Sequence, residues 1–387
     1  MQFKPPGVTR AAPGGPTEKH FMIINHHTYS LEYRDLGGRR LAQLAAEINF
    51  EPASECTTLA AQRKAHPSVT QARRNTTTII EPIPHSTAGS PYVSGFAVKI
   101  GAEGIESFSR EFPTSYFRAA AHAGSAALVK KGVMKEGDRF HYLVAAHPQV
   151  GALTEKRRMI VQQIEQPLPL RDGKLAEFTK QSVPFGELLE VDPPVYLPQE
   201  VIEQANALTE RARDKETGGI LIGHLYQDSS IPDIGVVVTA QIPARHAQGK
   251  STELTFTPKT WAAVRDQIAL RDRGEIMLGW WHSHPGRYWA ATTCAKCPPE
   301  RRRVCPISSN FFSAHDENLH EKIYPKAYSV ALVVTNTEEG LRQALYGWRD
   351  GRIQQRGFFI QRNQDRPLTA IEAVATPEDH DHEKTCT

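Results

Sequence analysis

The stretch over residues 275–285 constrains the fold more than any other part of the chain. Residues 275–281 (EIMLGWW) form an apolar run that predicts a buried β-strand, and a His-Ser-His-Pro motif follows directly. Residues two apart on a strand point to the same face, so the rings of His282 and His284 can converge on one metal ion. Pro285 has no N–H to donate, and we expect it to end the strand.

Two further motifs supply carboxylates. A Ser-x-x-Asp motif ends at Asp316, which completes a set of two imidazoles and one carboxylate. A catalytic zinc usually takes three protein ligands and leaves the fourth position to water, so this set predicts an open zinc site. Glu216 is the candidate base, since it lies where a helix over residues 201–212 ends and an apolar strand begins. Gly218 and Gly219 follow it and permit a close turn that a Cβ would obstruct.

In this order, the three motifs resemble those of the JAMM/MPN (JAB-like, Mov34-type) metallopeptidases. That family has a glutamate ahead of a Gly-Gly strand, then His-x-His-Pro, then Ser-x-x-Asp. The similarity covers residues 195–362. It implies a zinc isopeptidase that releases ubiquitin or a ubiquitin-like protein from an amide bond. The implied roles are zinc ligands for His282, His284 and Asp316, general base for Glu216 and oxyanion donor for Ser313.

The residue types agree with these roles. Zinc lowers the pKa of bound water to about 7. Glu216 can take the water proton and return it to the leaving amine. Ser313 would share the charge on the carbonyl oxygen, and losing such a donor typically costs about 2.7–4 kcal/mol. The alternatives are a JAB-type hydrolase of a small substrate on a sulfur-carrier protein and a non-catalytic MPN binding module. The complete ligand set favours an enzyme.

The insert over residues 286–312 holds three of the five cysteines. Cys294, Cys297 and Cys305 have the spacing of metal ligands, and thiolates favour zinc, so a second, structural zinc is predicted. The alternative is three free thiols or a redox pair. Three histidines are candidates for the fourth ligand of this site: His246, His315 and His320.

Charge and hydropathy exclude other classes of protein. A net charge of +3 gives no electrostatic case for nucleic acid as a partner. No run is long enough to cross a bilayer, and no export segment opens the chain. Clustered cysteines favour a reducing compartment, so we expect a cytoplasmic protein. The insert is locally basic, which predicts either a solvated face or a docking site for an acidic partner. Its basic residues are Arg287, Lys296, Arg301, Arg302 and Arg303.

The first half of the chain is less informative. Residues 1–19 are rich in Pro and Gly and predict a disordered tail. Residues 20–166 predict a smaller α+β region. From Phe21 the pattern predicts two strands joined by a short turn, then a helix over residues 41–48. A β-grasp fold opens in this order, so residues 20–85 resemble the ubiquitin-like domains of bacterial conjugation operons. An unrelated small domain is the alternative.

We therefore predict an α/β protein whose C-terminal domain, residues 195–362, is an α-β sandwich. The other predicted segments are strands over 92–100, 139–146 and 158–163, a helix over 119–131, a Pro-rich linker over 167–194, a helix from Pro258, a hairpin around Asp350-Gly351, and a solvated tail over 363–387. The resemblance implies as partners a ubiquitin-like protein and its conjugates. It also implies E1-like and E2-like partners from the same operon, in a phage-defence setting.

Overall fold

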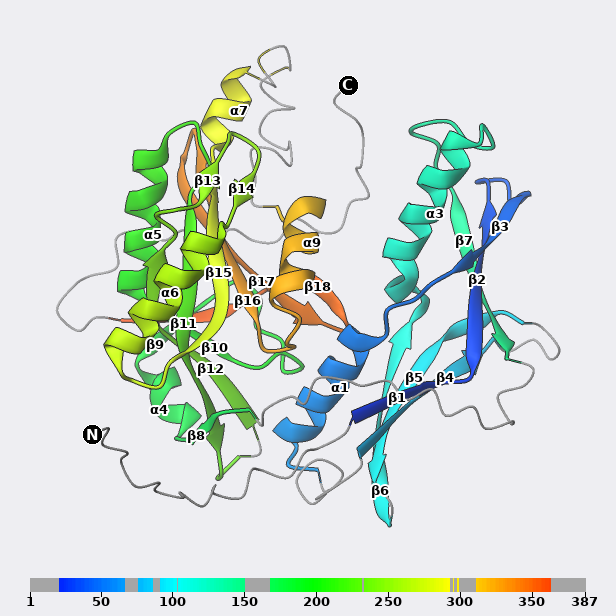
Figure 1. Ribbon diagram of the computed structural model, residues 1–387, viewed down its shortest axis with the longest axis horizontal. Helices are drawn as coiled ribbons and strands as arrows, with labels where there is room; N and C mark the ends of the chain where they lie inside the picture. The colour runs from blue at the N-terminus through cyan, green and yellow to red at the C-terminus, as the bar shows by residue number, and fades with distance from the viewer. Residues whose placement is uncertain are drawn as a thin grey trace, which may run out of the picture.

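The computed structural model describes residues 21–66, 76–85, 91–102, 104–149, 168–231, 233–292, 295, 298 and 311–362. The predicted tails, 1–19 and 363–387, and the predicted strand over 158–163 lie outside these ranges. Within them, no helix is long and apolar enough to cross a membrane. The C-terminal half forms one body of strands flanked by helices, and the N-terminal half packs beside it through α1 (Glu51–Arg63) (Figure 1).

A ten-stranded sheet forms the centre of the C-terminal half. Its strands are β8 (Leu170–Asp172), β9 (Ser182–Phe185), β10 (Val195–Pro198), β11 (Gly218–Asp228), β12 (Asp233–Pro243), β15 (Ile276–His284), β16 (Val330–Thr337), β17 (Gly340–Arg349), β18 (Arg352–Arg356) and β19 (Phe358–Gln361). Their order is β18-β17-β16-β15-β11-β12-β10-β19-β9, and β8 pairs with β11. A small hairpin of β13 (Gln248–Gly249) and β14 (Leu254–Thr255) lies outside this sheet.

Helices cover both faces of the central strands. Alternate strand residues point to opposite sides, so each face presents apolar side chains for a helix to bury. Leu221 on β11 packs in the same cluster as Ile202 of α5 (Gln199–Ala212), whereas its neighbours Ile220 and Ile222 pack with Val264 of α6 (Pro258–Arg271). This arrangement confirms the predicted α/β class. The helices of this half are α4 (Leu175–Lys180), α5 (Gln199–Ala212), α6 (Pro258–Arg271), α7 (Gly286–Thr292) and α9 (Ala314–Ile323).

The region over residues 167–194 is not the Pro-rich linker that the composition predicted. It contains β8, α4 and β9, which extend the C-terminal sheet: β8 pairs with β11 and β9 with β19. Proline is tolerated there because β9 is an edge strand, where a missing N–H does not break a ladder. Pro184 lies opposite Phe359 at this edge.

The predicted hairpin around Asp350-Gly351 is confirmed. Both turn residues have positive φ, 52° and 69°, as a two-residue hairpin turn requires. The returning strand is divided at Gly357, where a Cβ would lie 2.4 Å from the Glu187 carbonyl oxygen. β18 lies at one end of the strand order and β19 is next to the other end, yet only Gly357 separates these two strands in the chain. The sheet therefore curls so that its two end regions approach each other.

The N-terminal half contains two small sheets, in the orders β1-β4-β5-β6 and β3-β2-β7. The strands are β1 (Phe21–Asn25), β2 (His27–Arg34), β3 (Arg40–Ala46), β4 (Thr76–Pro84), β5 (Val93–Ala102), β6 (Ile105–Pro113) and β7 (His141–Pro148). The 3-10 helix η1 (Thr114–Phe117) leads into α3 (Arg118–Lys130). β5, β7 and α3 confirm three of the elements predicted from the sequence.

The helix predicted over residues 41–48 is wrong, because residues 41–46 belong to β3 and the next two residues have no regular secondary structure. Ala42, Leu44 and Ala46 are half-buried at every second position, and β3 pairs with β2. The first helix starts later, at Glu51. β1 and β2 lie in different sheets, so the element order that suggested a β-grasp fold is not the one observed.

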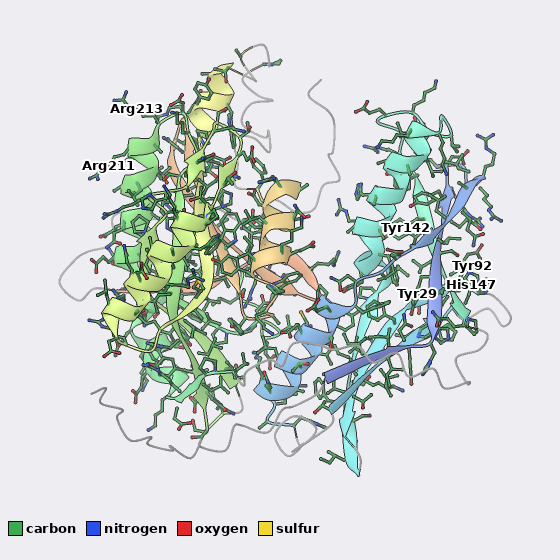
Figure 2. All side chains as sticks on the ribbon, in the orientation of Figure 1. Tyr29, Tyr92, Tyr142, His147, Arg211 and Arg213 are labelled. Atoms are coloured by element: carbon green, nitrogen blue, oxygen red, sulfur yellow. The ribbon has the colours of Figure 1, made fainter. Side chains whose placement is uncertain are left out.

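Polar side chains gather where β2 meets β7 in the N-terminal half. The Ser30 hydroxyl lies 3.0 Å from His147 Nε2, and the Tyr92 hydroxyl donates to Glu32 at 2.7 Å. Tyr92 and His147 lie together at the outer side of this half (Figure 2). Each of these groups has a structural partner, and the described residues of this half hold no cluster of potential metal ligands.

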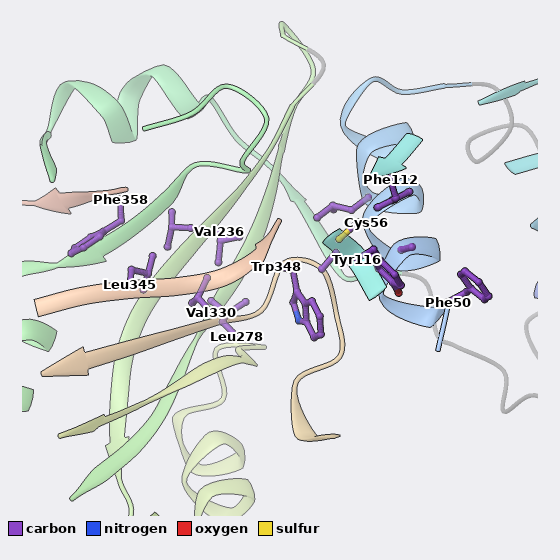
Figure 3. Close-up of a cluster of buried hydrophobic side chains, with 14 of the residues drawn as sticks. Phe50, Cys56, Phe112, Tyr116, Val236, Leu278, Val330, Leu345, Trp348 and Phe358 are labelled. Atoms are coloured by element: carbon purple, nitrogen blue, oxygen red, sulfur yellow. The ribbon is translucent and has the colours of Figure 1, made fainter. Parts of the chain in front are cut away.

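The interface between the halves, here called the α1 interface, combines apolar packing with paired charges. Cys56 and Phe50 belong to the same buried cluster as Trp348 and Val330 of the C-terminal half (Figure 3). Arg63 at the end of α1 donates to Asp233 at 2.6 Å and to two backbone carbonyl oxygens. The remaining cross-interface ion pairs among the described residues are Arg110 with Asp350 and Lys326 with Glu55.

Candidate metal centre

The C-terminal end of β15 places two imidazoles side by side. His282 and His284 are 1% and 2% exposed, and their Nε2 atoms lie 3.0 Å apart. Both are on the strand face that Trp280 also occupies, as the period of two predicts. Ser283 points the other way and bonds to Thr217 on the neighbouring chain segment. The sequence interpretation of a His-x-His pair at a strand end is confirmed geometrically.

The start of α9 supplies the carboxylate. Asp316 Oδ1 lies 3.3 Å from His282 Nε2, and Oδ2 lies 3.7 Å from His284 Nε2. Ser313 caps the helix: its hydroxyl and its backbone N–H donate to Asp316 Oδ2 at 2.7 and 2.9 Å. This is a capping box, in which cap and third helical residue bond to each other. The capping box therefore fixes the direction of the carboxylate toward the histidines.

These three side chains fit a metal ion. One ligand atom from each of His282, His284 and Asp316 lies within 4.8 Å of the others, and all three residues are buried. Two imidazoles and a carboxylate are the donors that zinc takes in open catalytic sites. Among the described residues, the Nδ1 atoms of His282 and His284 have no hydrogen-bond partner. Asp316 therefore holds the Nε2 side of each ring, and packing alone holds the Nδ1 side.

Burial and mutual charge shift the ionisation of the three residues in different directions. Burial disfavours the ionised Asp316, but His282, His284 and Ser313 outweigh it and hold the pKa of this carboxyl far below its usual range. Burial lowers the pKa of His284 to about 4. Burial acts in the same direction on His282, but Asp316 outweighs it and raises the pKa of that imidazole. The carboxylate is therefore ionised and ready to bind a cation.

Backbone hydrogen bonds hold Glu216 next to the group of His282, His284 and Asp316. Its N–H donates to the Lys250 carbonyl oxygen at 2.8 Å. The next residue, Thr217, exchanges two hydrogen bonds with Ser283, at 3.0 and 2.8 Å. The residue between the two histidines thus ties Glu216 to the metal-binding strand. Glu216 is 6% exposed, and burial raises its pKa to about 7 against the opposing effect of His282.

The two glycines after Glu216 are required by close packing of strands. Gly218 and Gly219 are strand residues of β11 and do not form a turn. A Cβ on Gly218 would lie 2.4 Å from the Trp281 carbonyl oxygen, and one on Gly219 would lie 2.5 Å from that of Ile242. The prediction that a side chain would be obstructed here holds, but the obstruction comes from β15 and β12 on either side.

Aromatic rings surround the histidines, and the sequence interpretation missed most of them. Trp280 stacks on His282 with centroids 4.5 Å apart and ring planes at 13°. Phe311 and Trp289 lie 4.5 and 5.1 Å from the His284 ring. Trp289 and Phe311 lie near the two ends of the insert, so both ends of the insert pack on the metal-binding group. Only the proximity of Trp289 to the His-x-His motif and of Phe311 to the Ser-x-x-Asp motif could have indicated this.

The cysteine site in the insert lies outside the described residues. This holds for Cys294, Cys297 and Cys305, and also for the basic run over residues 301–303. Among the histidines considered as a fourth ligand, His320 is fully buried, and its Nδ1 accepts a hydrogen bond from the Trp280 indole at 3.0 Å. That nitrogen therefore already has a partner.

Comparison with known proteins agrees with the site. Residues 198–288 match the family model described as prokaryotic homologs of the JAB domain. The match spans Glu216 and both histidines, ends before Asp316, and supports a JAB/MPN-type domain in the C-terminal half. No curated protein matches the chain. The solution structure of protein DSY2949 from Desulfitobacterium hafniense is 15% identical and aligns over 49% of this chain and 99% of its own, with a TM-score of 0.27. A TM-score this low carries no argument.

Proposed function

We propose that the chain is a zinc-dependent isopeptidase that hydrolyses the bond at the C-terminus of a ubiquitin-like protein. One observation carries this proposal: His282, His284 and Asp316 converge in a buried group next to a carboxylate, Glu216, whose pKa is raised to about 7. A general base works best when its pKa lies near the working pH. The JAB-type match makes a hydrolase or an MPN binding module the two classes to consider.

Each residue has a distinct task in this proposal. His282, His284 and Asp316 hold the metal ion, with Asp316 aimed by the capping box. A zinc ion held by these three side chains would supply a bound water with a pKa of about 7 and a Lewis acid for the substrate carbonyl. Glu216 takes the proton of the attacking water and donates it to the leaving amine. Its low exposure excludes bulk water, which preserves the proton for that transfer.

Ser313 has two candidate tasks. In the structure its hydroxyl proton is given to Asp316 Oδ2, so its first task is to orient that ligand. The resemblance to JAMM/MPN enzymes adds the task of donating to the oxyanion, which would require the hydroxyl to turn from Asp316 to the substrate. Losing an oxyanion donor typically costs about 2.7–4 kcal/mol of transition-state stabilisation.

The substrate proposal rests on the rings beside the ligands. Trp289 and Phe311 pack on His284 and place two bulky rings beside this ligand. A glycine-rich tail, extended like most bound peptides, suits such a passage. We propose deconjugation or precursor processing as the activity, with E1-like and E2-like partners and an antiviral role; the resemblance to enzymes of bacterial ubiquitin-like conjugation supports this proposal.

The insert adds two further proposals. Cys294, Cys297 and Cys305 would bind a second, structural zinc, so that purified protein would carry about two metals per chain. Arg301, Arg302 and Arg303 would dock an acidic face of the protein substrate. Replacing these arginines with Glu should weaken cleavage of a folded substrate and leave a short tail peptide unaffected.

The experiment that tests the substrate class uses a ubiquitin-like protein with an extended C-terminus. The zinc-loaded protein should cut after the last glycine of the ubiquitin-like part, and mass spectrometry of the products locates the cut. Cleavage of small acyl amides, but not of the fusion, would favour a hydrolase of small substrates. Zinc binding and fusion binding without any cleavage would favour a non-catalytic module.

A further inference from the structure

His320 is a fully buried residue that no step of the proposed reaction uses. It is 0% exposed and lies on α9, four residues after Asp316. Residues four apart lie on the same side of a helix, so His320 faces β15 one turn below the carboxylate ligand. Its Nδ1 accepts a hydrogen bond from the Trp280 indole at 3.0 Å. This bond joins the ligand-bearing helix to the ligand-bearing strand.

Trp280 carries the contact on to a ligand. Its ring stacks on His282 at 4.5 Å with ring planes 13° apart. Histidines that bind metal usually donate their other N–H to a fixed acceptor, which sets the ring plane. Among the described residues, His282 Nδ1 has no such acceptor. The plane of the His282 ring is therefore set by the indole under it, and the indole is held by His320.

The protonation of His320 follows from its partner. An indole N–H can only donate, so Nδ1 must be unprotonated and the ring proton sits on Nε2. Burial lowers the pKa of His320 to about 3, against the opposing effect of the Ser329 backbone, so the ring is neutral. The rings of Tyr324 and Trp348, each with its centroid 5.8 Å away, hold the imidazole in place.

We propose that His320 is a positioning residue for the metal centre: through the Trp280 indole it fixes the His282 ring and braces β15 against α9. The inference rests on the proposed metal site. An apolar residue at position 320 would leave the indole N–H buried without an acceptor, and the ring would turn or shift to recover one. His282 would then lose its stacked partner, while Asp316 would keep its capping box.

The test is metal affinity, measured without any substrate. Metal-free protein that carries Cys294→Ser and Cys297→Ser, and so lacks the proposed second site, is titrated with zinc against a chromophoric chelator, and with Co²⁺ for its visible spectrum; all variants share this background. We expect His320→Leu to weaken binding about 10–100-fold, the usual effect of losing an outer partner of a ligand. His320→Gln, which keeps an acceptor, should recover most of the affinity. Trp280→Phe should weaken binding as His320→Leu does, and the double variant should be no weaker than Trp280→Phe alone.

His224→Leu is the matched control. His224 is also buried, but it lies on β11 six residues from Gly218, which pairs with His282. Its replacement should leave metal affinity unchanged. If the wild type binds no zinc, the proposed function fails together with this inference. If the wild type binds zinc and His320→Leu binds it equally well, only the inference is overturned. Should His320→Leu fail to fold, wild-type affinity in Trp280→Phe would overturn it.

Discussion

The metal centre and the α1 interface both contain charged side chains, but these side chains are paired differently at the two places. At the interface each cation meets a carboxylate: Arg63 is bidentate with Asp233, and Arg349, close by, is bidentate with Asp192. At the metal centre one carboxylate faces two imidazoles, and a second, Glu216, has its pKa raised to about 7 by burial. Incompletely paired groups with perturbed pKa values are typical of functional sites, and fully paired ones are typical of structural contacts.

This contrast makes separate predictions for stability and for chemistry. Groups that are paired in the folded chain should affect the free energy of unfolding when replaced, with no effect on metal binding. Groups at the metal centre should affect metal binding and catalysis, and their effect on stability should depend on whether the metal is present.

The largest stability effect is expected for Asp192→Ala. Asp192 is 8% exposed and bonds to Arg349 and Arg356, the second of which is 3% exposed. Removing one partner of a buried ion pair leaves charge without compensation and costs about 3–5 kcal/mol. Urea unfolding measures the loss. Glu81→Gln, which breaks an exposed pair with Lys99, is the control and should cost less than about 1 kcal/mol. Equal small losses in both variants would contradict the assignment of Asp192 to a paired, buried network.

A smaller effect is expected from zinc itself. A ligand that binds only the folded state at 100 times its dissociation constant stabilises that state by about 2.7 kcal/mol. We therefore expect zinc to raise the Tm of the wild type, measured by scanning calorimetry. In a background that carries Cys294→Ser and Cys297→Ser, and so lacks the proposed second site, Asp316→Asn should abolish the increase, since it removes the negative ligand and keeps the shape of the side chain in the capping box. A zinc-induced increase that survives in Asp316→Asn would place the metal elsewhere in the chain.

The smallest of these effects concerns acid stability. Arg271 donates to Glu275 at 2.5 and 2.8 Å and, with Thr239, lowers the pKa of this carboxyl to about 2 despite its burial. The folded-state pKa is below the unfolded value of 4.5, so the contribution is present above pH 4.5 and is lost as the pH falls toward 2. Glu275→Gln should lose roughly 1.5 kcal/mol at neutral pH and show a flatter decline in acid. Identical acid profiles for the two proteins would show that the pair does not contribute.

The sequence predicted the local parts of the site and not the long-range ones. The His-x-His strand, the Ser-x-x-Asp helix start and the Glu216 position follow from strand period, capping and motif order, all of which act within a few residues. The contact of His320 with Trp280 joins residues 40 apart, and no local pattern indicates which buried histidine accepts from which indole.

The fold errors have the same origin. Leu41, Leu44 and Ile48 fit a helical period, but Ala42, Leu44 and Ala46 fit a strand equally well, and a segment this short does not decide between them. Pairing with β2 decides the outcome, and that partner cannot be read from the segment itself. Prolines over residues 167–194 indicated a linker because the sequence does not reveal that β9 lies at a sheet edge.

The most direct test of the central claim compares Glu216→Gln with His282→Ala in metal content and in cleavage of an extended ubiquitin-like protein. Glu216→Gln should keep its catalytic zinc, measured by elemental analysis, and lose activity by about 10²–10⁴-fold, because a base does not hold the metal. His282→Ala should lose the activity and the catalytic zinc, and keep any zinc held by the insert cysteines. Full activity in Glu216→Gln, or unchanged zinc in His282→Ala, would contradict the assignment of base and ligand.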